Sequence, residues 1–357
     1  MPIDLYPYLE RLESLIDLEH VARTRELQRR AFAFQPVDHI PTVIHYPLPP
    51  DEWPHFGFEE IFVDPTKMLL HELADVYAGA KLQDDRLYGI RANYGTGIVA
   101  ALFGCPTVTF TDSLPTATAV APEQLARILD GDIPPLHQGL PGRALETVAF
   151  FREALRPYPK LAQAVGSQLL DIQGPFDNAA IIWGSDIYTA LYDAPERVAR
   201  LLDLVTAATL ALVREHRHID GCPLDEHDGA WNFLGGVCIR NDATVNLSPQ
   251  HYVEHVRPYD ARLLAPYGGW IHFCGRTRWW EQLLDLPNLR GINPYQGEFY
   301  DLATMYARCA AAGVAIVQWT RPLDARCREL IRTGFSRIVW TEDYVSAYRA
   351  RAQAYTS

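Results

Sequence analysis

The segment Gly291–Thr320, GINPYQGEFYDLATMYARCAAAGVAIVQWT, contains two short apolar runs separated by an amphipathic stretch. Gly291–Tyr295 and Val314–Thr320 have the length of buried strands, whereas Tyr300–Ala312 repeats its apolar residues at helical spacing. A strand, a helix and a second strand in this order indicate a βαβ unit, in which the two strands run parallel in one sheet.

The same alternation continues on both sides of this segment. The sequence predicts eight strands, at Pro41–Tyr46, Thr107–Phe110, Gln168–Gln173, Pro223–His227, Trp270–Cys274, Gly291–Tyr295, Val314–Thr320 and Arg337–Thr341. The predicted helices are Glu196–His216, Arg278–Leu286, Tyr300–Ala312, Leu323–Thr333 and Glu342–Ala354, together with one that starts at Ser248-Pro249 and continues through Asp260–Leu264.

Eight parallel strands joined by helices are typical of an α/β fold of the (β/α)8 TIM-barrel type. An open doubly wound sheet would usually carry a Gly-rich phosphate-binding turn after its first strand, and His45-Tyr46-Pro47 is not such a turn. We therefore predict a barrel over residues 37–357, preceded by an N-terminal helical extension over residues 1–36.

Composition narrows the classes of function. The chain has 357 residues and a net charge of −12, from 32 Lys and Arg against 44 Asp and Glu. Its densest basic stretch, Arg23–Arg30, is interrupted by Glu26, so we expect no nucleic-acid partner. No stretch approaches the roughly 18 uncharged apolar residues of a membrane span. Met1–Glu10 has no signal-peptide core, and the six cysteines form no CxxC pair, so we expect a soluble cytoplasmic protein.

The chemistry of a barrel lies at the carboxyl ends of its strands, which directs attention to His272 and Cys274. Residues two apart on a strand point to the same side, so the imidazole and the thiol converge. Together they suit a borderline-soft divalent ion, of which zinc is the commonest. The alternative is a half-buried strand with a packed cysteine and a hydrogen-bonded histidine.

Longer stretches carry a resemblance to a known family. Residues 246–260, NLSPQHYVEHVRPYD, and residues 269–275, GWIHFCG, resemble the uroporphyrinogen decarboxylase superfamily. Gly174-Pro175, residues 192–197 (YDAPER) and residues 38–41 (DHIP) resemble further segments of it. The resemblance runs from about Arg30 to the end of the chain and implies a (β/α)8 barrel.

The superfamily has two functional branches. Its porphyrinogen decarboxylases carry an Arg-Gln-Ala-Gly-Arg signature that grips propionates, and residues 45–53 here read HYPLPPDEW instead. Its zinc methyltransferases and related demethylases move methyl groups to or from a corrinoid protein, and their mark is His-x-Cys with a third cysteine on the last strand. His272 and Cys274 match that mark, but residues 338–341, IVWT, contain no cysteine. Glu298, just beyond the sixth strand, is our predicted third metal ligand.

Other polar residues near predicted strand ends are candidates for the site. We predict catalytic roles for His227, Asp171 and Asp242, although solvated loop charges are an equally ordinary explanation for the Asp225–Asp228 run. The predicted substrate-binding residues are His45, Tyr94, Gln173, Arg240, Gln296 and Gln318. Arg240 could hold an anionic group of a substrate, and a surface ion pair is the alternative.

The sequence thus favours a metal-dependent methyltransferase that moves a methyl group between a small substrate and a corrinoid or thiol acceptor. We expect zinc as its cofactor and a corrinoid protein as its partner. Two alternatives stay open. One is a lyase or decarboxylase that acts on a small carboxylate through Asp171, His227 and Arg240. The other is a non-catalytic, ligand-binding barrel.

Overall fold

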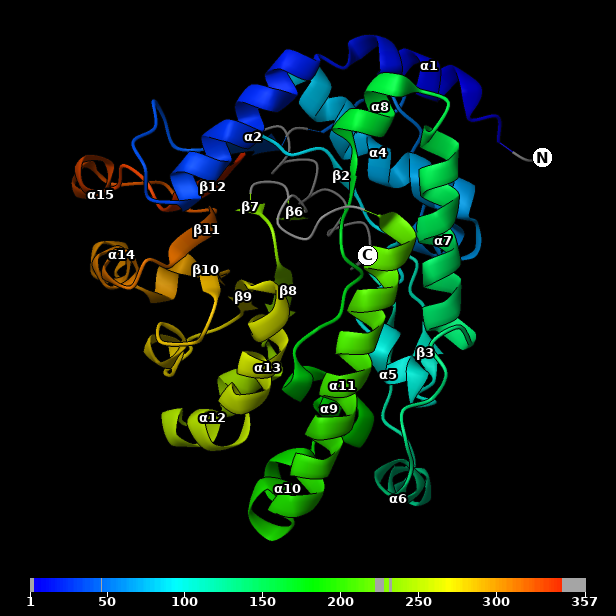
Figure 1. Cartoon of the computed structure of the whole chain (residues 1–357), viewed down its shortest axis with the longest axis vertical. Helices are drawn as coiled ribbons and strands as arrows, with labels where there is room; N and C mark the ends of the chain where they lie inside the picture. The colour runs from blue at the N-terminus through cyan, green and yellow to red at the C-terminus, as the bar shows by residue number, and fades with distance from the viewer. Residues whose placement is uncertain (1–2, 46, 222–227, 231–232, 342–357) are drawn as a thin grey trace, which may run out of the picture.

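The structure, a computed structural model, describes residues 3–45, 47–221, 228–230 and 233–341. The predicted strand Pro223–His227 and the predicted helix Glu342–Ala354 therefore lie outside the described residues. Figure 1 shows the strands β8 to β12 following one another along an arc, with helices outside them.

Parallel strands form the centre of the fold. The main sheet has six strands in the order β1-β12-β11-β10-β9-β8. Their bounds are β1 Thr42–His45, β8 Val237–Arg240, β9 Gly269–Phe273, β10 Leu289–Pro294, β11 Ala315–Trp319 and β12 Phe335–Trp340. A separate parallel pair joins β2 (Gly89–Ile90) to β5 (Gly166–Ser167). Because the first strand lies beside the last one, this α/β arrangement is consistent with a TIM-like barrel, although the strand ladders described here do not close into a ring.

Other hydrogen bonds span the two places where the ladders stop. Asp84 and Asp85, ahead of β2, accept the backbone N–H groups of Ile44 and Thr42 at 2.8 Å. On the other side, the N–H of Gly174 donates to the carbonyl oxygen of Arg240 at 2.7 Å. These contacts thus tie the segment before β2 and the segment after β5 to the main sheet where no regular ladder forms.

Fifteen α-helices, three 3-10 helices and two small hairpins complete the described part of the chain. The α-helices are α1 Tyr6–Leu15, α2 Leu18–Phe32, α3 Phe58–Val63, α4 Pro65–Leu82, α5 Ile98–Leu102, α6 Pro122–Asp130, α7 Gly139–Leu155, α8 Pro159–Ala164, α9 Pro175–Trp183, α10 Ile187–Asp193, α11 Pro195–Asp220, α12 Pro249–His255, α13 Arg257–Tyr267, α14 Leu302–Ala311 and α15 Ala325–Leu330. The 3-10 helices are η1 Ala243–Asn246, η2 Trp280–Leu283 and η3 Gly297–Phe299, and the antiparallel hairpins pair β3 Thr107–Val108 with β4 Thr116–Ala117 and β6 Asp228–Ala230 with β7 Phe233–Leu234.

The helices begin where the sequence supplies caps. The side chain of Asp17 accepts two backbone N–H groups at the start of α2, and the side chains of Ser248 and Asp301 each accept one at the starts of α12 and α14. The longest helix, α11, has proline in its first turn, where no backbone donor is needed. Helices α1 and α2 precede β1, and the division of the chain into an extension and a barrel stays a prediction.

A small apolar cluster fills one face of the main sheet. It consists of Cys238, Trp270, Ala315 and Val317, and Phe32 at the end of α2 packs against it. Cys238 and Trp270 are register partners, and Arg240 and His272 are partners two residues further along the same two strands. Since side chains two apart share a face, the face that is apolar early in these strands becomes polar at their carboxyl ends.

Several sequence-based boundaries were wrong. Thr107–Phe110 is not a barrel strand, because Thr107–Val108 forms a hairpin and the second parallel strand is β2. Of the predicted strand Gln168–Gln173, no residue joins a ladder, since β5 ends at Ser167. Helix Arg278–Leu286 shortens to the single 3-10 turn η2. The segment containing Arg240, expected to be a loop, includes strand β8.

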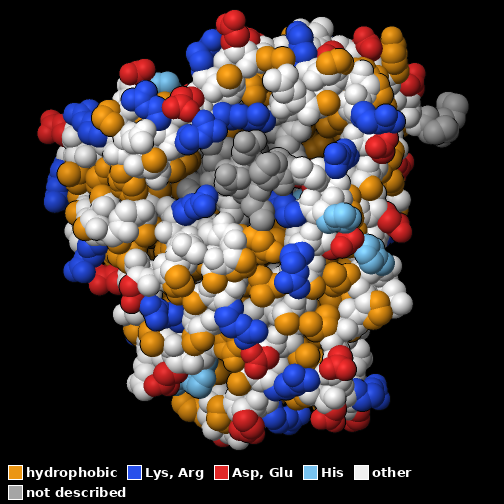
Figure 2. Space-filling model, in the orientation of Figure 1, with side chains coloured by type: hydrophobic (Ala, Val, Ile, Leu, Met, Phe, Trp, Pro, Cys, Tyr) orange, Lys and Arg blue, Asp and Glu red, His pale blue; other side chains and the backbone are white. Residues whose placement is uncertain are grey.

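On the face drawn in Figure 2, the side chains of Lys and Arg are interspersed with those of Asp and Glu. No helix in the described ranges is long and apolar enough to cross a membrane.

Candidate metal centre

Asp242, His272 and Cys274 converge at the carboxyl ends of β8 and β9. One ligand atom from each of these residues lies within 4.8 Å of the other two. His272 Nε2 is 3.4 Å from Cys274 Sγ and 3.4 Å from Asp242 Oδ1. Oxygen, nitrogen and sulfur donors therefore surround one point, with His272 and Cys274 adjacent as their spacing predicted.

Strand register explains why Asp242 reaches this point. Arg240 and His272 are partners, so the residues two positions beyond them also lie side by side. The N–H of Asn241 donates to the carbonyl oxygen of His272 at 2.9 Å, which extends the pairing by one residue. The carboxylate of Asp177, in the first turn of α9, accepts the N–H of Asp242 at 2.8 Å. Two strands and one helix thus fix the position of Asp242.

Gly174 allows this close approach of the segments. A Cβ atom at Gly174 would lie 2.1 Å from Asn241 Oδ1 and 2.6 Å from the carbonyl oxygen of Arg240. Neither distance is sterically possible without movement of the chain. The absence of a side chain at Gly174 therefore lets the loop before α9 lie directly against the end of β8.

Asn293 orients the imidazole of His272. Its Nδ2 donates to the carbonyl oxygen of Val317 at 2.7 Å, which turns its Oδ1 towards His272 Nδ1 at 2.6 Å. Because Oδ1 can only accept, Nδ1 must carry the proton. In the neutral imidazole the lone pair of Nε2 then faces Asp242 and Cys274, which is the tautomer that a metal-binding histidine requires.

The surroundings shift the pKa values of the two other donors in opposite directions. Burial and the nearby Asp242 carboxylate raise the pKa of Cys274 to about 12. Burial also tends to raise the pKa of Asp242, but the interactions of its carboxylate with His272, Cys274 and Arg240 together bring this pKa below its usual value. Asp242 Oδ1 is buried and has no hydrogen-bond partner among the described residues. A divalent cation would satisfy this oxygen, and the mixed O, N, S donor set suits zinc or a similar transition metal.

A second polar group surrounds Asp171. Arg240 Nη1 donates to Asp171 Oδ1 at 2.8 Å, and Gln173 Nε2 donates to the same oxygen at 2.5 Å. Arg91 Nη1 lies 3.5 Å from Asp171 Oδ2. Three of the predicted site residues, Asp171, Gln173 and Arg240, are therefore in direct contact, and Arg91 joins them.

Two predicted residues have unusual backbone conformations. Gln173 and Gln318 have φ values of 50° and 55°, in the left-handed region that residues other than glycine rarely adopt. The N–H of Gln318 donates to Ser336 Oγ at 3.0 Å. Backbone strain of this kind is common near functional sites, and both residues lie near the carboxyl end of a strand or of its extension.

The remaining predicted residues are distributed more widely. Gln296 accepts the N–H of Gly275 at 2.6 Å, directly after Cys274. Glu298 lies outside the group of three ligands, and its Oε2 is 3.9 Å from Arg321 Nε. The structure thus places Asp242, and not Glu298, in the candidate group, and the predicted role of Glu298 as a ligand stays a prediction.

His45 and Tyr94 are buried in other surroundings. His45 stacks on Trp340 with 4.9 Å between ring centroids, and burial lowers its pKa to about 4. Tyr94 bonds through its hydroxyl to Thr147 Oγ1 at 2.8 Å, in contact with helix α7. His227 lies outside the described residues, so its role stays a prediction.

Sequence reasoning missed the supporting residues Asn293, Asp177 and Arg91. Asn293 was recognisable as a polar residue at a strand end, but its role depends on its register opposite His272. Asp177 follows Gly174-Pro175 in the first turn of a helix. Acidic residues are common at this position, so nothing in the sequence indicated its contact with Asp242.

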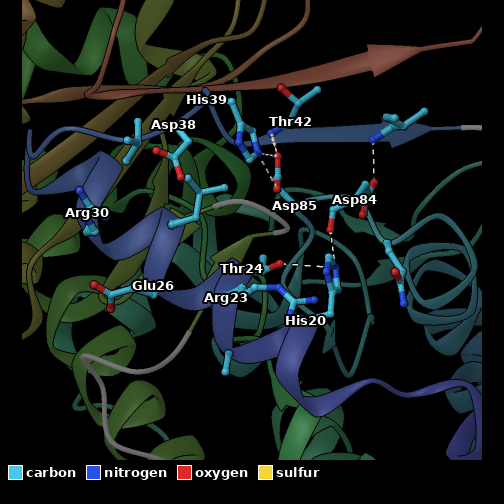
Figure 3. Close-up of a pocket in the computed structure, with 15 residues that line it drawn as sticks. His20, Arg23, Thr24, Glu26, Arg30, Asp38, His39, Thr42, Asp84 and Asp85 are labelled. Carbon is cyan, nitrogen blue, oxygen red and sulfur yellow. Dashed lines mark hydrogen bonds and ion pairs between the residues drawn. The ribbon is translucent and has the colours of Figure 1, made fainter.

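A cavity of about 760 Å³ lies near the amino end of β1, between α2 and the residues before β2. Figure 3 shows His39 pointing towards Asp85 and His20 towards Asp84. His39 Nε2 is 3.0 Å from both carboxylate oxygens of Asp85, and His20 Nε2 is 2.9 Å from the carbonyl oxygen of Asp84. These polar groups are thus hydrogen-bonded to one another at the segment before β2. Because residues at the amino ends of barrel strands typically contribute to stability, we assign these groups a structural role.

Fold and site together describe an α/β protein, consistent with a TIM-like barrel, that has a candidate transition-metal site at the carboxyl ends of two of its strands. No family model matches the chain, and no curated protein matches it. Among solved structures, the chain is similar to a methyltransferase from Methanosarcina mazei, with a TM-score of 0.61. The two are 14% identical over 93% of this chain and 98% of the other, a likeness that shows the fold alone.

Proposed function

We propose that this protein is a metal-dependent methyltransferase that moves a methyl group between a small substrate and a corrinoid or thiol acceptor. The observation that carries the proposal is the convergence of Asp242, His272 and Cys274, with Asn293 holding the histidine in its metal-binding tautomer. The structural likeness to a methyltransferase supports it. So do the sequence features shared with the zinc methyltransferases.

In this proposal Asp242, His272 and Cys274 hold a divalent transition metal, zinc in the first instance. When bound, the ion would act as a Lewis acid that lowers the pKa of a thiol or polarises the group that leaves the methyl carbon. Asn293 keeps Nε2 of His272 free of a proton, and Gln296 holds the backbone that follows Cys274. The half-exposed ring of Tyr295 lies beside His272, with 5.8 Å between ring centroids.

The transfer of a methyl group from methylcobalamin to a thiol needs no other reactant. The sulfur attacks the methyl carbon, the carbon–cobalt bond breaks, and both electrons of that bond stay on cobalt. The products are a methyl thioether, Co(I) and the proton released from the thiol. The chain's residues therefore need to bind and deprotonate a thiol, and no oxidant or reductant takes part.

We also propose that a corrinoid protein delivers or receives the methyl group. A pocket of about 410 Å³ is formed by the segment that follows Cys274 in the chain and by residues around η3 and α14, and its lining includes Arg276, Arg278 and Phe299. Phe299 and the nearby Tyr295 are about half exposed. Aromatic and arginine side chains of this kind are enriched where proteins bind one another, which supports a docking role for this rim.

The rival acid–base lyase draws less support from the site. Asp171, a candidate base for that reaction, already accepts hydrogen bonds from Arg240 and Gln173. Arg91 lies against its other oxygen, and the side chain is only 4% exposed, so neighbouring groups already occupy this carboxylate.

An anaerobic assay with methylcobalamin and a series of thiols tests the proposal. We expect the absorption of methyl-Co(III) to give way to that of Co(I) with the wild-type protein, and turnover to fall at least roughly 100-fold in Cys274→Ala and His272→Ala. Cys327→Ala, which removes a buried thiol from α15, is the matched control and should retain activity. Equal turnover in Cys274→Ala and the control would overturn the metal-centred reaction.

A further inference from the structure

Arg240 lies beside the candidate metal centre. It is the register partner of His272 on the neighbouring parallel strand, so the two Cα atoms are about 4.8 Å apart and both side chains leave the same face of the sheet. The Arg240 side chain is 22% exposed, which leaves part of its guanidinium accessible.

Asp171 holds this guanidinium in a fixed orientation. The Asp171 side chain is only 4% exposed, so its contact with Arg240 is not the surface ion pair that the sequence left open as an alternative. Gln173 donates to Asp171 Oδ1, the oxygen that also accepts from Arg240, while Arg91 lies against Oδ2. The buried carboxylate is thus held from both sides.

Arg240 has donors to spare. Only its Nη1 has a hydrogen-bond partner within the described ranges, so Nε and Nη2 are available for a ligand. A guanidinium presents such donors in a planar fork that matches the two oxygens of a carboxylate. A preoriented fork binds an anion more tightly than a mobile arginine because less side-chain freedom is lost on binding.

Resting on the proposed function, we infer that its small substrate carries an anionic group, a carboxylate by chemistry, which Arg240 binds while the reacting atom meets the Asp242–His272–Cys274 group. The chain carries a net charge of −12, so an anionic substrate needs such a local positive site. Asp171 contacts Nη1 of Arg240, and Arg91 contacts Asp171. Both therefore act as positioning residues, and they leave Nε and Nη2 of Arg240 for the substrate.

Thiols that differ in charge test this inference on protein loaded with cobalt(II) in place of zinc. The probes are 3-mercaptopropionate, neutral 2-mercaptoethanol and cationic 2-aminoethanethiol. Each thiol is titrated while the sulfur-to-cobalt absorption is followed, which gives a dissociation constant without turnover. We expect 3-mercaptopropionate to bind roughly 10- to 100-fold more tightly than 2-mercaptoethanol, and the cation to bind most weakly.

Two variants locate the source of that preference. Arg240→Gln should abolish it and leave cobalt content unchanged, and Arg240→Lys, which keeps the charge without the fork, should retain part of it. Arg23→Gln removes the same charge from an exposed position on α2 and should bind like wild type.

The outcomes separate the two ideas. Cobalt(II) that binds without any thiol-dependent change contradicts the proposed function itself. Thiol binding without a preference for the carboxylate contradicts the anionic substrate alone. A preference that persists in Arg240→Gln also overturns the inference, because the carboxylate would then be binding the metal directly.

Discussion

Replacing Asn293 by alanine should weaken metal binding although Asn293 is not itself a ligand. The substitution removes the 2.6 Å hydrogen bond to His272 Nδ1, and with it the preference for the tautomer that presents Nε2. Loss of such a supporting residue typically lowers metal affinity about 10- to 100-fold. That range corresponds to about 1.4–2.8 kcal/mol of binding free energy.

The same substitution also affects folding, and a second variant separates the two effects. Asn293 is buried and donates to the carbonyl oxygen of Val317, which would lose its partner in Asn293→Ala at a cost of about 1–3 kcal/mol of stability. Asn293→Asp loses that donor too, but it keeps an acceptor for His272 Nδ1. We therefore expect both variants to be less stable and only Asn293→Ala to bind metal weakly.

Zinc affinity is measured by competition with a coloured chelator, and stability by urea denaturation of metal-free protein. Asn246→Ala is the matched control, since the exposed Asn246 donates, among the described residues, only to the hydroxyl of Tyr188. Wild-type zinc affinity in Asn293→Ala would refute the role assigned to Asn293. Equally weak binding in Asn293→Asp would show that packing, and not the acceptor, matters.

Three further predictions follow from single side chains. Burial lowers the pKa of His45 from 6.5 to about 4, so the unfolded chain takes up a proton that the folded chain rejects as the pH falls through this window. At pH 5 this difference in proton uptake should lower the free energy of unfolding by about 2 kcal/mol. The variant His45→Asn should lose less stability than wild type between pH 7 and pH 5 in urea denaturation. An equal loss in both proteins would contradict the role assigned to His45. Gly174→Ala should lower the free energy of unfolding by about 1–3 kcal/mol, because the added Cβ would clash with the end of β8. Gly57→Ala, whose Cβ would have no contact under 3.7 Å, should lower it less in the same urea denaturation. Asp242→Asn should lower zinc affinity at least roughly 10-fold while Glu298→Ala leaves it unchanged, and the reverse order in chelator competition would restore Glu298 as the third ligand.

The second half of the fold was predictable because its elements are long. Strands β9 to β12 each have five or six residues, and clear helical periods separate several of them. In the first half, β2 and β5 have two residues each, too few to show a period. Their positions depend on Asp84, Asp85 and other contacts between distant segments, which a local pattern does not contain.

The candidate site was predictable only in part, for a related reason. His272 and Cys274 are two residues apart on one strand, so their proximity follows from alternation. The third candidate donor, Asp242, follows the neighbouring strand β8, and its position depends on register and on the hydrogen bond from the Asp242 N–H to Asp177. Glu298 is closer to Cys274 in sequence, but in the structure its carboxylate is near Arg321.

Zinc stoichiometry tests the central claim most directly. Wild-type protein, loaded with zinc and passed over a desalting column, should retain about one zinc ion per chain in elemental analysis. Cys274→Ala should retain almost none, and Cys327→Ala should match wild type. A wild-type protein without retained zinc, or equal zinc in wild type and Cys274→Ala, would contradict the account.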